Sequence, residues 1–485
     1  MKTHTFTLIC LVSFSLFFIG CKNDDDNVRP SISVNDFVWK AMNLWYYWQE
    51  QSPKLADDAF PTANAYQQFI QAQSTQDLFY GLLYDRGQTD RFSWIVEDYH
   101  ALDQQFAGIN KSFGMNYGLV YESAQSDKIF GYVRYVLPHS SADLAGMHRG
   151  QIFSRINGVQ LTASNYVSLL SQNTANFGMA ILQNGHLQDL NLNISLSQTE
   201  IQENPIHLAK VLDFGTQKVG YLLYNGFRAN FNDELNETIG YFRSQDITDL
   251  VIDLRYNGGG TVQTAAYLGS MITGQFNEQD FTRLYFNQKA ANNNSVYTFT
   301  NKGKTYDDDL NENGHVNFNH LFLNRLFILT SNQTASASEM LISCMNAYIN
   351  VNVFGQKTYG KTVGSITLYD SPNKGYTSSE AANPNHTWAM QPIVFEYKNV
   401  LDQSSPSQGI EPLQNINELH YLEHLPPLGS LEDPLLAAAL QQIVPNASKT
   451  TSVPMNTHLK AVEISEKLQR FSTEMYLDKG FDFNP

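Results

Sequence analysis

The chain has 485 residues, of which 42% are apolar, and its formal net charge is −16. At roughly 150 residues per domain this length predicts about three domains, and the apolar fraction excludes an intrinsically disordered chain. The acidic balance, without a cluster of Lys and Arg, argues against a nucleic-acid partner, because phosphate contacts need such a cluster.

Residues 1–20 have the pattern of an export signal, with an apolar run from Phe6 to Ile19. This run is shorter than the roughly 20 residues of a comfortable membrane span. Ile19-Gly20-Cys21 resembles the end of a bacterial lipobox, which implies that Cys21 is lipidated and becomes the new N-terminus. The alternative is an ordinary secretory signal that happens to contain a cysteine.

Residues 21–33 are expected to form a solvated tether, and the acidic run Lys22–Asn27 resembles the surface-export signal of Bacteroidetes lipoproteins. A plain polar linker is the alternative. We therefore expect an exported protein, lipid-anchored in the bacterial cell envelope at the periplasmic or surface face of the outer membrane. Cys10 leaves with the signal, so Cys344 is the cysteine of the folded body, where its apolar helical surroundings predict a buried thiol.

Residues 34–109 are rich in aromatic and amphipathic segments. Apolar residues at positions 38, 41, 42, 45 and 48 follow helical spacing, which predicts a small helical N-terminal domain with these side chains buried. A surface lipoprotein that binds glycans through exposed Trp39, Trp45 and Trp48 is a competing interpretation, and the helical spacing argues against it.

Residues 110–200 change to short strands separated by turns. Strands are predicted at Asn116–Val120 and Gly131–Val136, a helix at Ser141–Ala145, and a further strand entering an Asn-Gly turn at Gln151–Gly158. This order resembles a PDZ domain, in which a peptide adds a strand to an open sheet edge, although a generic small β-domain is also compatible. By that resemblance the carboxylate-binding loop, and hence the peptide site, comprises Tyr117, Gly118, Leu119 and Val120.

Residues 206–443 alternate short apolar runs with helical patterns. The runs Lys218–Tyr224, Asp249–Leu254 and Arg325–Thr330 are typical of buried strands, so we expect right-handed crossovers in a sheet with helices on its faces. The predicted fold class is a multidomain α/β (α+β) protein with a helical N-terminal domain, a PDZ-like β-domain and an α/β core. Residues 444–485 form a C-terminal extension, in which His458–Phe471 predicts a packing helix or a flexible segment.

Ser336 follows one of these strands and begins a predicted helix from Ala337 to Tyr348. A serine hydroxyl needs a neighbouring base to become a nucleophile, and a helix N-terminus favours developing negative charge. The N-H of Ala337 is therefore a candidate donor to an oxyanion. A purely structural interpretation is equally compatible, in which Ser336 caps the helix and Glu339 completes a capping box.

Two further segments contain residues that are suited to catalysis. Three successive glycines in Asp253–Thr261 allow backbone N-H groups, including those of Gly258 and Gly259, to converge on an oxyanion. A phosphate-binding loop is disfavoured at this position, because these three glycines are not part of a Gly-x-x-x-x-Gly-Lys-Ser/Thr pattern. Lys361 lies in a Gly-Lys turn, and a lysine acts as a base only where burial keeps it neutral. Taken alone, it is better explained as a surface charge.

Together these segments resemble the C-terminal processing peptidase family, also called tail-specific proteases, in a Bacteroidetes-type PDZ-containing lipoprotein form. The motifs are Asp253–Gly260, Ser336–Glu339 and Gly360-Lys361, with late segments at Gly409–Pro412 and Glu432–Leu435. The resemblance implies a serine endopeptidase with an α/β catalytic core of that type. It also implies the roles: Ser336 is the nucleophile, Lys361 the general base, and Gly258 or Gly259 with Ala337 the oxyanion hole.

The chain departs from the family at two positions. Ser365 stands where several members carry a Gln that orients the lysine, and its hydroxyl, although of shorter reach, is the candidate to orient Lys361 by accepting a hydrogen bond from the amine. Ala347 stands where some members carry an Asp. We expect polypeptide substrates recognised by their C-terminal tails, and the alternative is a catalytically impaired, peptide-binding lipoprotein. No cofactor or metal is expected, since Asp309–Gly314 resembles a calcium loop whose twelfth position is His320 instead of Glu.

Overall fold

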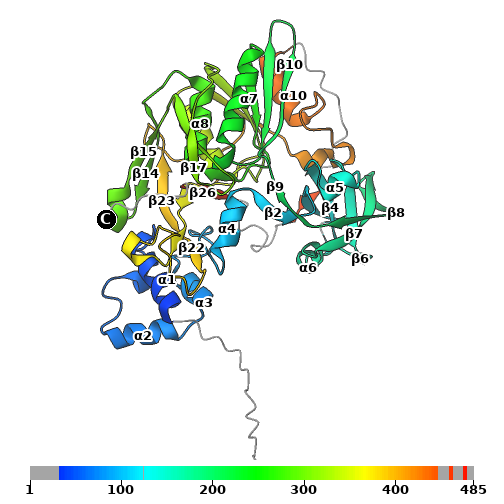
Figure 1. Ribbon diagram of the computed structural model, residues 1–485. Coiled ribbons are helices and arrows are strands. Elements are labelled where there is room, and N and C mark those ends of the chain that lie inside the picture. Colours follow the sequence, from blue (N-terminus) through cyan, green and yellow to red (C-terminus); the bar gives the residue numbers. More distant parts are fainter. Residues whose placement is uncertain (1–31, 124, 446–457, 463–472, 478–485) are drawn as a thin grey trace, which may run out of the picture.

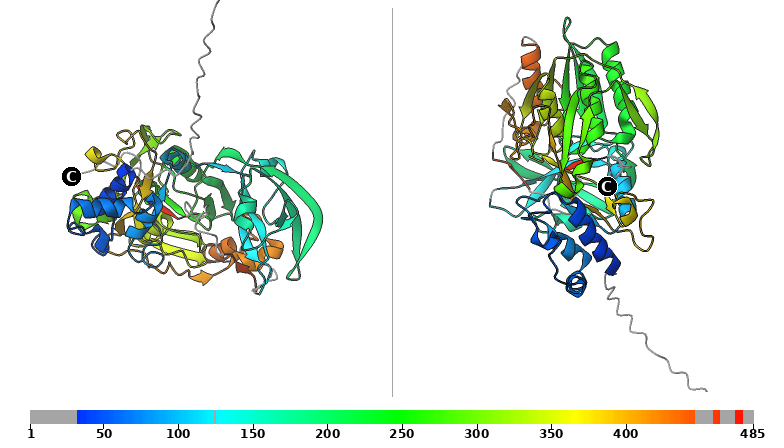
Figure 2. Two further views of the ribbon diagram at one scale, coloured as in Figure 1. Left: turned by 90° about the horizontal axis from the view of Figure 1, so that it is seen from below. Right: turned by 90° about the vertical axis from the view of Figure 1, so that its left-hand side faces the viewer.

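The computed structural model describes residues 32–123, 125–445, 458–462 and 473–477 (Figure 1). The predicted export signal, the lipidation site Cys21 and most of the tether lie outside these residues. No helix in the described ranges combines the length and the apolar character needed to cross a membrane. The first three helices, within residues 32–82, and the main sheet lie at opposite ends of the molecule, as Figure 2 also shows.

The N-terminal region is helical, as predicted. Its first helix, α1, buries Val38, Ala41, Met42 and Trp45 completely, so the helical spacing identified the core face. Trp39 is partly buried and donates to the carbonyl of Lys54 at 2.8 Å, which disfavours an exposed aromatic binding surface. The helices are α1 (Ile32–Trp45), α2 (Ala63–Gln71), α3 (Thr75–Leu82) and α4 (Tyr99–Phe106).

A separate antiparallel sheet with its own hydrophobic core follows, which we call the β-rich domain (residues 115–197). Its Asn157-Gly158 turn has positive φ at both residues, as the sequence predicts for a tight hairpin. The elements are β3 (Met115–Tyr121), β4 (Ile129–Val136), α5 (Ser141–Leu144), β5 (Ile152–Ile156), β6 (Val159–Gln160), α6 (Tyr166–Leu170), β7 (Thr174–Gln183) and β8 (His186–Ser197). A ribbon of β2 (Ile109–Ser112) and β9 (Thr199–Gln202) connects it to the rest.

The main sheet has the order β10-β11-β12-β18-β19-β24 and is parallel except at β10. Helices α7, α8 and α9 pack on one face and α10 on the other, which confirms the predicted α/β core. The strands are β10 (Ile206–Asp213), β11 (Lys218–Tyr224), β12 (Asp249–Asp253), β18 (Arg325–Thr330), β19 (Asn350–Gly355) and β24 (Gln414–Asn415). The helices are α7 (Asn232–Ser244), α8 (Val262–Thr273), α9 (Ala337–Asn346) and α10 (Pro434–Ile443).

A second sheet of short strands joins distant parts of the chain in the order β13-β26-β20-β23-β14-β15. Its β26 comes from the C-terminal extension and lies between β13 and β20. The strands are β13 (Gly259–Thr261), β14 (Asp280–Phe286), β15 (Ser295–Thr298), β20 (Val363–Ser365), β23 (Ile393–Lys398) and β26 (Glu474–Tyr476).

The C-terminal extension corrects one prediction. The expected packing helix over His458–Phe471 is wrong at its start, because Lys460–Ala461 form strand β25, which pairs with the edge of β3. A sheet edge offers a row of unpaired N-H and C=O groups, and pairing with it outweighs the weak helical preference of these residues. Residues 463–471 of that prediction lie outside the described ranges.

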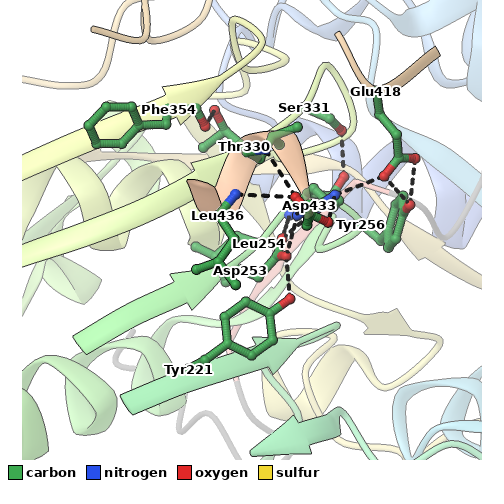
Figure 3. A network of polar contacts seen from close by, with 12 residues as sticks. Tyr221, Asp253, Leu254, Tyr256, Thr330, Ser331, Phe354, Glu418, Asp433 and Leu436 are labelled. Carbon is green, nitrogen blue, oxygen red and sulfur yellow. Dashed lines mark hydrogen bonds and ion pairs between the residues drawn. The ribbon is translucent and has the colours of Figure 1, made fainter. Parts of the chain in front are cut away.

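A buried ion-pair network holds the main sheet to its neighbours. The guanidinium of Arg255, only 1% exposed, contacts Asp253 at 2.8 Å, Glu418 at 2.8 Å and Asp433 at 2.9 Å. Figure 3 shows that the hydroxyl of Tyr221 donates a hydrogen bond to Asp253 and that the hydroxyl of Tyr256 donates one to Glu418. One cation therefore joins Asp253, its near neighbour in the sequence, to Glu418 and Asp433, which lie far from it in the sequence.

The same network fastens the β-rich domain. Arg149, which follows α5, donates to Glu418 at 2.6 Å and to the hydroxyl of Tyr256 at 2.8 Å. Burial alone raises the pKa of a carboxyl, but Arg149 and Arg255 reverse that effect and lower the pKa of Glu418 to about 2. Glu418 is therefore charged at neutral pH and bridges the two arginines.

Removing the central cation tests this network. Arg255→Leu leaves the buried carboxylates of Asp253 and Asp433 without their cation and Glu418 with Arg149 alone, and we expect it to lower the free energy of unfolding by about 3–5 kcal/mol. Denaturant unfolding followed by circular dichroism measures this loss. The matched control is Arg283→Leu, which removes an ion pair between Arg283 and Asp280 at the surface. Equal unfolding midpoints for the two variants would contradict the structural role of Arg255.

Candidate active site

Ser336 lies in the turn between β18 and α9 and is fully buried. Its φ of 66° is in the left-handed region, which an L-residue other than glycine adopts only when its surroundings enforce it. With Glu339 it has the arrangement of a capping box, yet its Oγ has no hydrogen-bond partner of good geometry in the described chain. A strained, buried hydroxyl without a partner is better explained by chemistry than by helix capping.

The carboxylate of Glu339 joins the serine turn to the lysine turn. Oε2 accepts the backbone N-H of Ser336 at 2.9 Å and that of Lys361 at 2.8 Å. Oε1 accepts the N-H of Gly360 at 2.7 Å and the hydroxyl of Thr358. Burial raises the pKa of Glu339, while these hydrogen bonds oppose the rise. The sequence predicts the contact of Glu339 with Ser336 through the capping-box pattern. It does not predict the contacts of Glu339 with the lysine turn, because these depend on the tertiary fold.

Lys361 is buried, with 2% of its surface exposed. Burial lowers the pKa of its amine below the ordinary lysine value, and the charges of Glu474, Asp90 and Glu339 oppose this shift only in part. A buried amine with a lowered pKa fits a general base. In this structure Nζ donates to the carbonyl oxygen of Thr473 at 2.7 Å, and the ammonium lies 5.0 Å from the centre of the Phe92 ring.

The glycine loop (residues 258–260) lies directly against Ser336. A Cβ placed on Gly259 would be 2.9 Å from Cβ of Ser336 and 3.0 Å from the backbone N of Ala337. The structure therefore brings together the glycine and serine segments. The N-H of Gly259 is already bonded to Oδ1 of Asn257 at 2.8 Å, so the predicted donors without such a bond are the N-H groups of Gly258 and Ala337.

Asn257 is a residue that the sequence did not single out. Its carbonyl oxygen accepts the N-H of Ala335 at 3.2 Å and the hydroxyl of Ser338 at 3.1 Å, and its side chain donates to the carbonyl of Tyr224 at 2.8 Å. These bonds clamp the glycine loop onto the serine turn. The only sequence signal is its position next to the glycines.

Ser365 and Ala347 occupy the two positions where the chain departs from the family pattern. Oγ of Ser365 donates to the carbonyl oxygen of Met475 at 3.3 Å, a bond that directs it to the C-terminal strand and away from the predicted task of orienting Lys361. Ala347 follows the last residue of α9 as its C-cap. The acceptor that orients the lysine amine here is the carbonyl of Thr473.

The predicted peptide-binding residues Tyr117, Gly118, Leu119 and Val120 lie within strand β3, which confirms the strand predicted at Asn116–Val120 but not the loop that the PDZ resemblance implied. Gly118 is explained by packing, because a Cβ there would be 2.3 Å from the ring of Tyr132. One edge of β3 pairs with β4 and the other with β25. A cavity of about 940 Å³ extends from this strand to the glycine loop, and its lining includes Tyr117, Leu119 and the three loop glycines.

Comparisons with known proteins agree with this geometry. Residues 218–396 match Peptidase family S41, and residues 33–94 match the Peptidase S41 N-terminal domain. A carboxyl-terminal-processing protease of Picosynechococcus sp. is 24% identical over 254 residues, which are 52% of this chain and 56% of that protein. A probable CtpA-like serine protease of Staphylococcus epidermidis is 20% identical over 347 residues, 70% of this chain and 59% of that protein. The chain thus spans less than two thirds of these relatives.

Among solved structures, a Bacteroides fragilis protein assigned to the S41 proteases is similar over 84% of this chain and 96% of its own length. The TM-score is 0.65 and the sequence identity is 24%. At this identity the similarity concerns the fold alone.

The role of Glu339 in joining the two turns can be tested without an activity assay. Glu339→Ala leaves the N-H groups of Ser336, Gly360 and Lys361 unpaired, at a cost of about 1–3 kcal/mol for each buried group. We expect a large drop in the unfolding midpoint and faster amide exchange at residues 358–361. Glu339→Gln keeps one acceptor oxygen, so its effect should be smaller.

The matched control is Glu411→Ala, because the side chain of Glu411 is 73% exposed and pairs with Lys357 at the surface. If Glu339→Ala and Glu411→Ala give the same exchange rates at residues 358–361, the carboxylate of Glu339 does not hold the lysine turn.

Proposed function

The chain belongs to peptidase family S41, and on that premise we propose that it is a serine endopeptidase with a Ser336–Lys361 dyad. The observation that carries the proposal is the convergence of three distant segments at one buried point. Ser336 and Ala337 lie against Gly259, and Glu339 binds the backbone of both Ser336 and Lys361. Such a convergence is costly for a protein that needs no chemistry there, since it buries an amine and an unbonded hydroxyl.

In the proposed reaction, Oγ of Ser336 attacks the carbonyl carbon of a peptide bond while the neutral amine of Lys361 takes the hydroxyl proton. The N-H groups of Ala337 and Gly258 stabilise the oxyanion of the tetrahedral intermediate. Lys361 then gives its proton to the leaving amine, which leaves an acyl-enzyme on Ser336. A water attacks this ester, with Lys361 again accepting and returning the proton, and the serine is restored.

We propose that the substrates are unfolded polypeptides recognised through the edge of β3. This edge accepts an antiparallel strand from another part of the chain, which is the main-chain geometry of peptide addition to a PDZ domain. The cavity continues from β3 to the glycine loop, so one extended chain can contact both. Recognition of C-terminal tails is part of this proposal.

A second candidate is a peptide-binding protein that does not turn over. It is favoured by two observations: Lys361 donates to Thr473 and not to Ser336, and Ser365 does not hold the lysine amine. In that case the cavity and the β3 edge would bind peptides without cleavage. An active-serine probe separates the candidates, because it labels Ser336 in a peptidase and leaves it unlabelled in a binding protein.

The dyad is tested by Ser336→Ala and Lys361→Ala, assayed separately with an unfolded, tailed protein substrate. Each variant should lose roughly 10⁴-fold or more in kcat, because the dyad acts as a unit. Matched controls are Ser244→Ala at the exposed end of α7 and Lys357→Ala at the surface, which should retain activity. Wild-type cleavage by either folded dyad variant would exclude the mechanism.

The pH dependence follows from the protonation of Lys361. Only the neutral amine accepts the serine proton, so kcat/KM should be low in acid and rise with pH through the pKa of Lys361. Burial lowers this pKa, and the rise should therefore be centred below the ordinary lysine value of 10.5. A profile of kcat/KM between pH 6 and 10, over a range in which circular dichroism shows an intact fold, measures it. A flat profile contradicts a lysine base.

A further inference from the structure

The C-terminal extension contacts both ends of the peptide path, by which we mean the cavity that extends from the edge of β3 to the glycine loop. Near the β-rich domain, β25 pairs antiparallel with the edge of β3, with Lys460 opposite Tyr121 and Ala461 opposite Val120. The N-H of Val462 donates to the carbonyl of Leu119 at 2.9 Å. The side chain of Val462 is buried in the core of the β-rich domain. These residues are bound as an added strand.

The second contact is at the glycine loop. The N-H of Glu474 donates to the carbonyl oxygen of Gly258 at 2.8 Å, and β26 runs parallel to β13. A Cβ on Gly259 would be 2.0 Å from the carbonyl oxygen of Glu474. The same point is 2.9 Å from Cβ of Ser336 and 3.0 Å from the N of Ala337. The carbonyl oxygen of Glu474 therefore lies close both to the nucleophile and to a predicted oxyanion donor.

Ser336 and Lys361 are not hydrogen-bonded to each other in this arrangement. The amine of Lys361 is bonded to the carbonyl of Thr473, while Oγ of Ser336 has no hydrogen-bond partner within the described ranges. Thr473, Glu474 and Tyr476 line the cavity, whereas Ser336 is fully buried and does not line it. Because Ser336 is fully buried, a peptide bond can reach it only after a neighbouring part of the chain has moved.

We propose that two parts of the C-terminal extension, residues 458–462 at the β3 edge and residues 473–477 at the glycine loop, act as an intramolecular pseudosubstrate: they are bound as extended peptide and block the dyad until a substrate displaces them. The inhibitory consequence rests on the proposed peptidase function. The binding of the segment to the peptide path does not depend on catalysis.

Two features distinguish a displaceable ligand from a permanent strand of the sheet. The carboxyl of Glu474 is 7% exposed, and its Oε2 has no hydrogen-bond partner among the described residues, so docking leaves a buried polar group unsatisfied. On its other side, β26 pairs with β20 at a single position, Ser365 with Tyr476. Two apolar side chains hold β26 in place despite these unfavourable features. Met475 is fully buried, and Tyr476 stacks on Phe106 with ring centroids 4.2 Å apart.

Covalent attachment makes such a ligand effective despite weak contacts. A tethered segment has an effective concentration on the order of millimolar, so a substrate in solution competes with a nearly saturated site. Loosening the anchors should therefore release the site. This is the expected behaviour of an inhibitor and the opposite of what removal of a structural strand would do.

The first experiment measures docking without catalysis. In the full-length chain with Ser336→Ala, amide exchange is compared for three forms: no further change, Met475→Asp and Tyr476→Ala. Met475→Asp places a charge in the apolar core, and Tyr476→Ala removes the stack on Phe106. We expect faster exchange of the amides of residues 474–477 and of Gly258–Thr261 in both variants, with the unfolding midpoint of the main sheet retained.

The second experiment measures cleavage of an unfolded, tailed substrate by the same tail variants with Ser336 intact. We expect kcat/KM to rise at least about tenfold, which corresponds to about 1.4 kcal/mol of docking free energy. A synthetic peptide of residues 458–477, added in trans, should reverse the increase competitively. The matched control, Leu192→Thr, changes an exposed residue of β8 and should behave as the wild type.

The outcomes are distinguishable. Released tail amides with unchanged or reduced cleavage, in a chain whose wild type cleaves, would overturn the proposal and make β26 a structural strand. Tail amides that remain protected in both variants while cleavage rises would also overturn it. Release of the tail and rebinding of the peptide, without cleavage by any form, would support the segment as a ligand of this path and contradict the peptidase.

Discussion

The buried guanidinium of Arg255 is the contact on which the arrangement of the molecule depends. It neutralises Asp253 at the end of β12, Glu418 before the last helix and Asp433, whose carboxylate also caps α10 at the N-H groups of Leu435 and Leu436. Two of these carboxylates are fully buried and would repel each other without the cation. Because Arg255 directly precedes Tyr256 and the glycine loop, the same ion pairs fix the chain at the point where it enters the candidate active site.

Glu339 has a corresponding role inside the site, with a different physical basis. It has no cation as partner and is held by backbone N-H groups and the hydroxyl of Thr358. This leaves the charge of Lys361 without a directly bonded carboxylate, which keeps its amine able to lose a proton. A carboxylate that binds the backbone of the lysine turn, and not the lysine amine itself, combines precise placement with a lowered pKa.

Much of this could be predicted from the sequence. The strands Lys218–Tyr224 and Arg325–Thr330 were found with correct ends, because continuous apolar runs bounded by turns are typical of buried parallel strands. The segments that meet at Ser336 were also identified from their residues. Tyr117–Val120 was assigned to a carboxylate-binding loop from the resemblance to a PDZ domain, whereas it lies in strand β3, where Gly118 makes room for the ring of Tyr132. Such a contact between neighbouring strands is set by packing and leaves no local signal.

The C-terminal strands could not be predicted for a related reason. Two or three residues have no strand pattern of their own, and their conformation is determined by a partner edge more than two hundred residues away in the chain. The helical spacing of His458–Phe471 therefore outweighed the signal of Lys460–Ala461. The contact of Ser365 was not predicted for the same reason, since its partner Met475 belongs to a strand that the sequence did not reveal.

The position of β26 between β13 and β20 also sets a limit on what can enter the site. Neighbouring strands lie about 4.8 Å apart, so a gap that holds a single strand is about 10 Å wide between the strands that border it. A helix with its side chains is about as wide as this gap, and a folded domain is far wider. Only a fully extended chain fits beside the glycine loop. On the proposed pseudosubstrate role of β26, a substrate that replaces it must be an unfolded polypeptide, so the width of the gap alone excludes folded proteins without any recognition of their sequence.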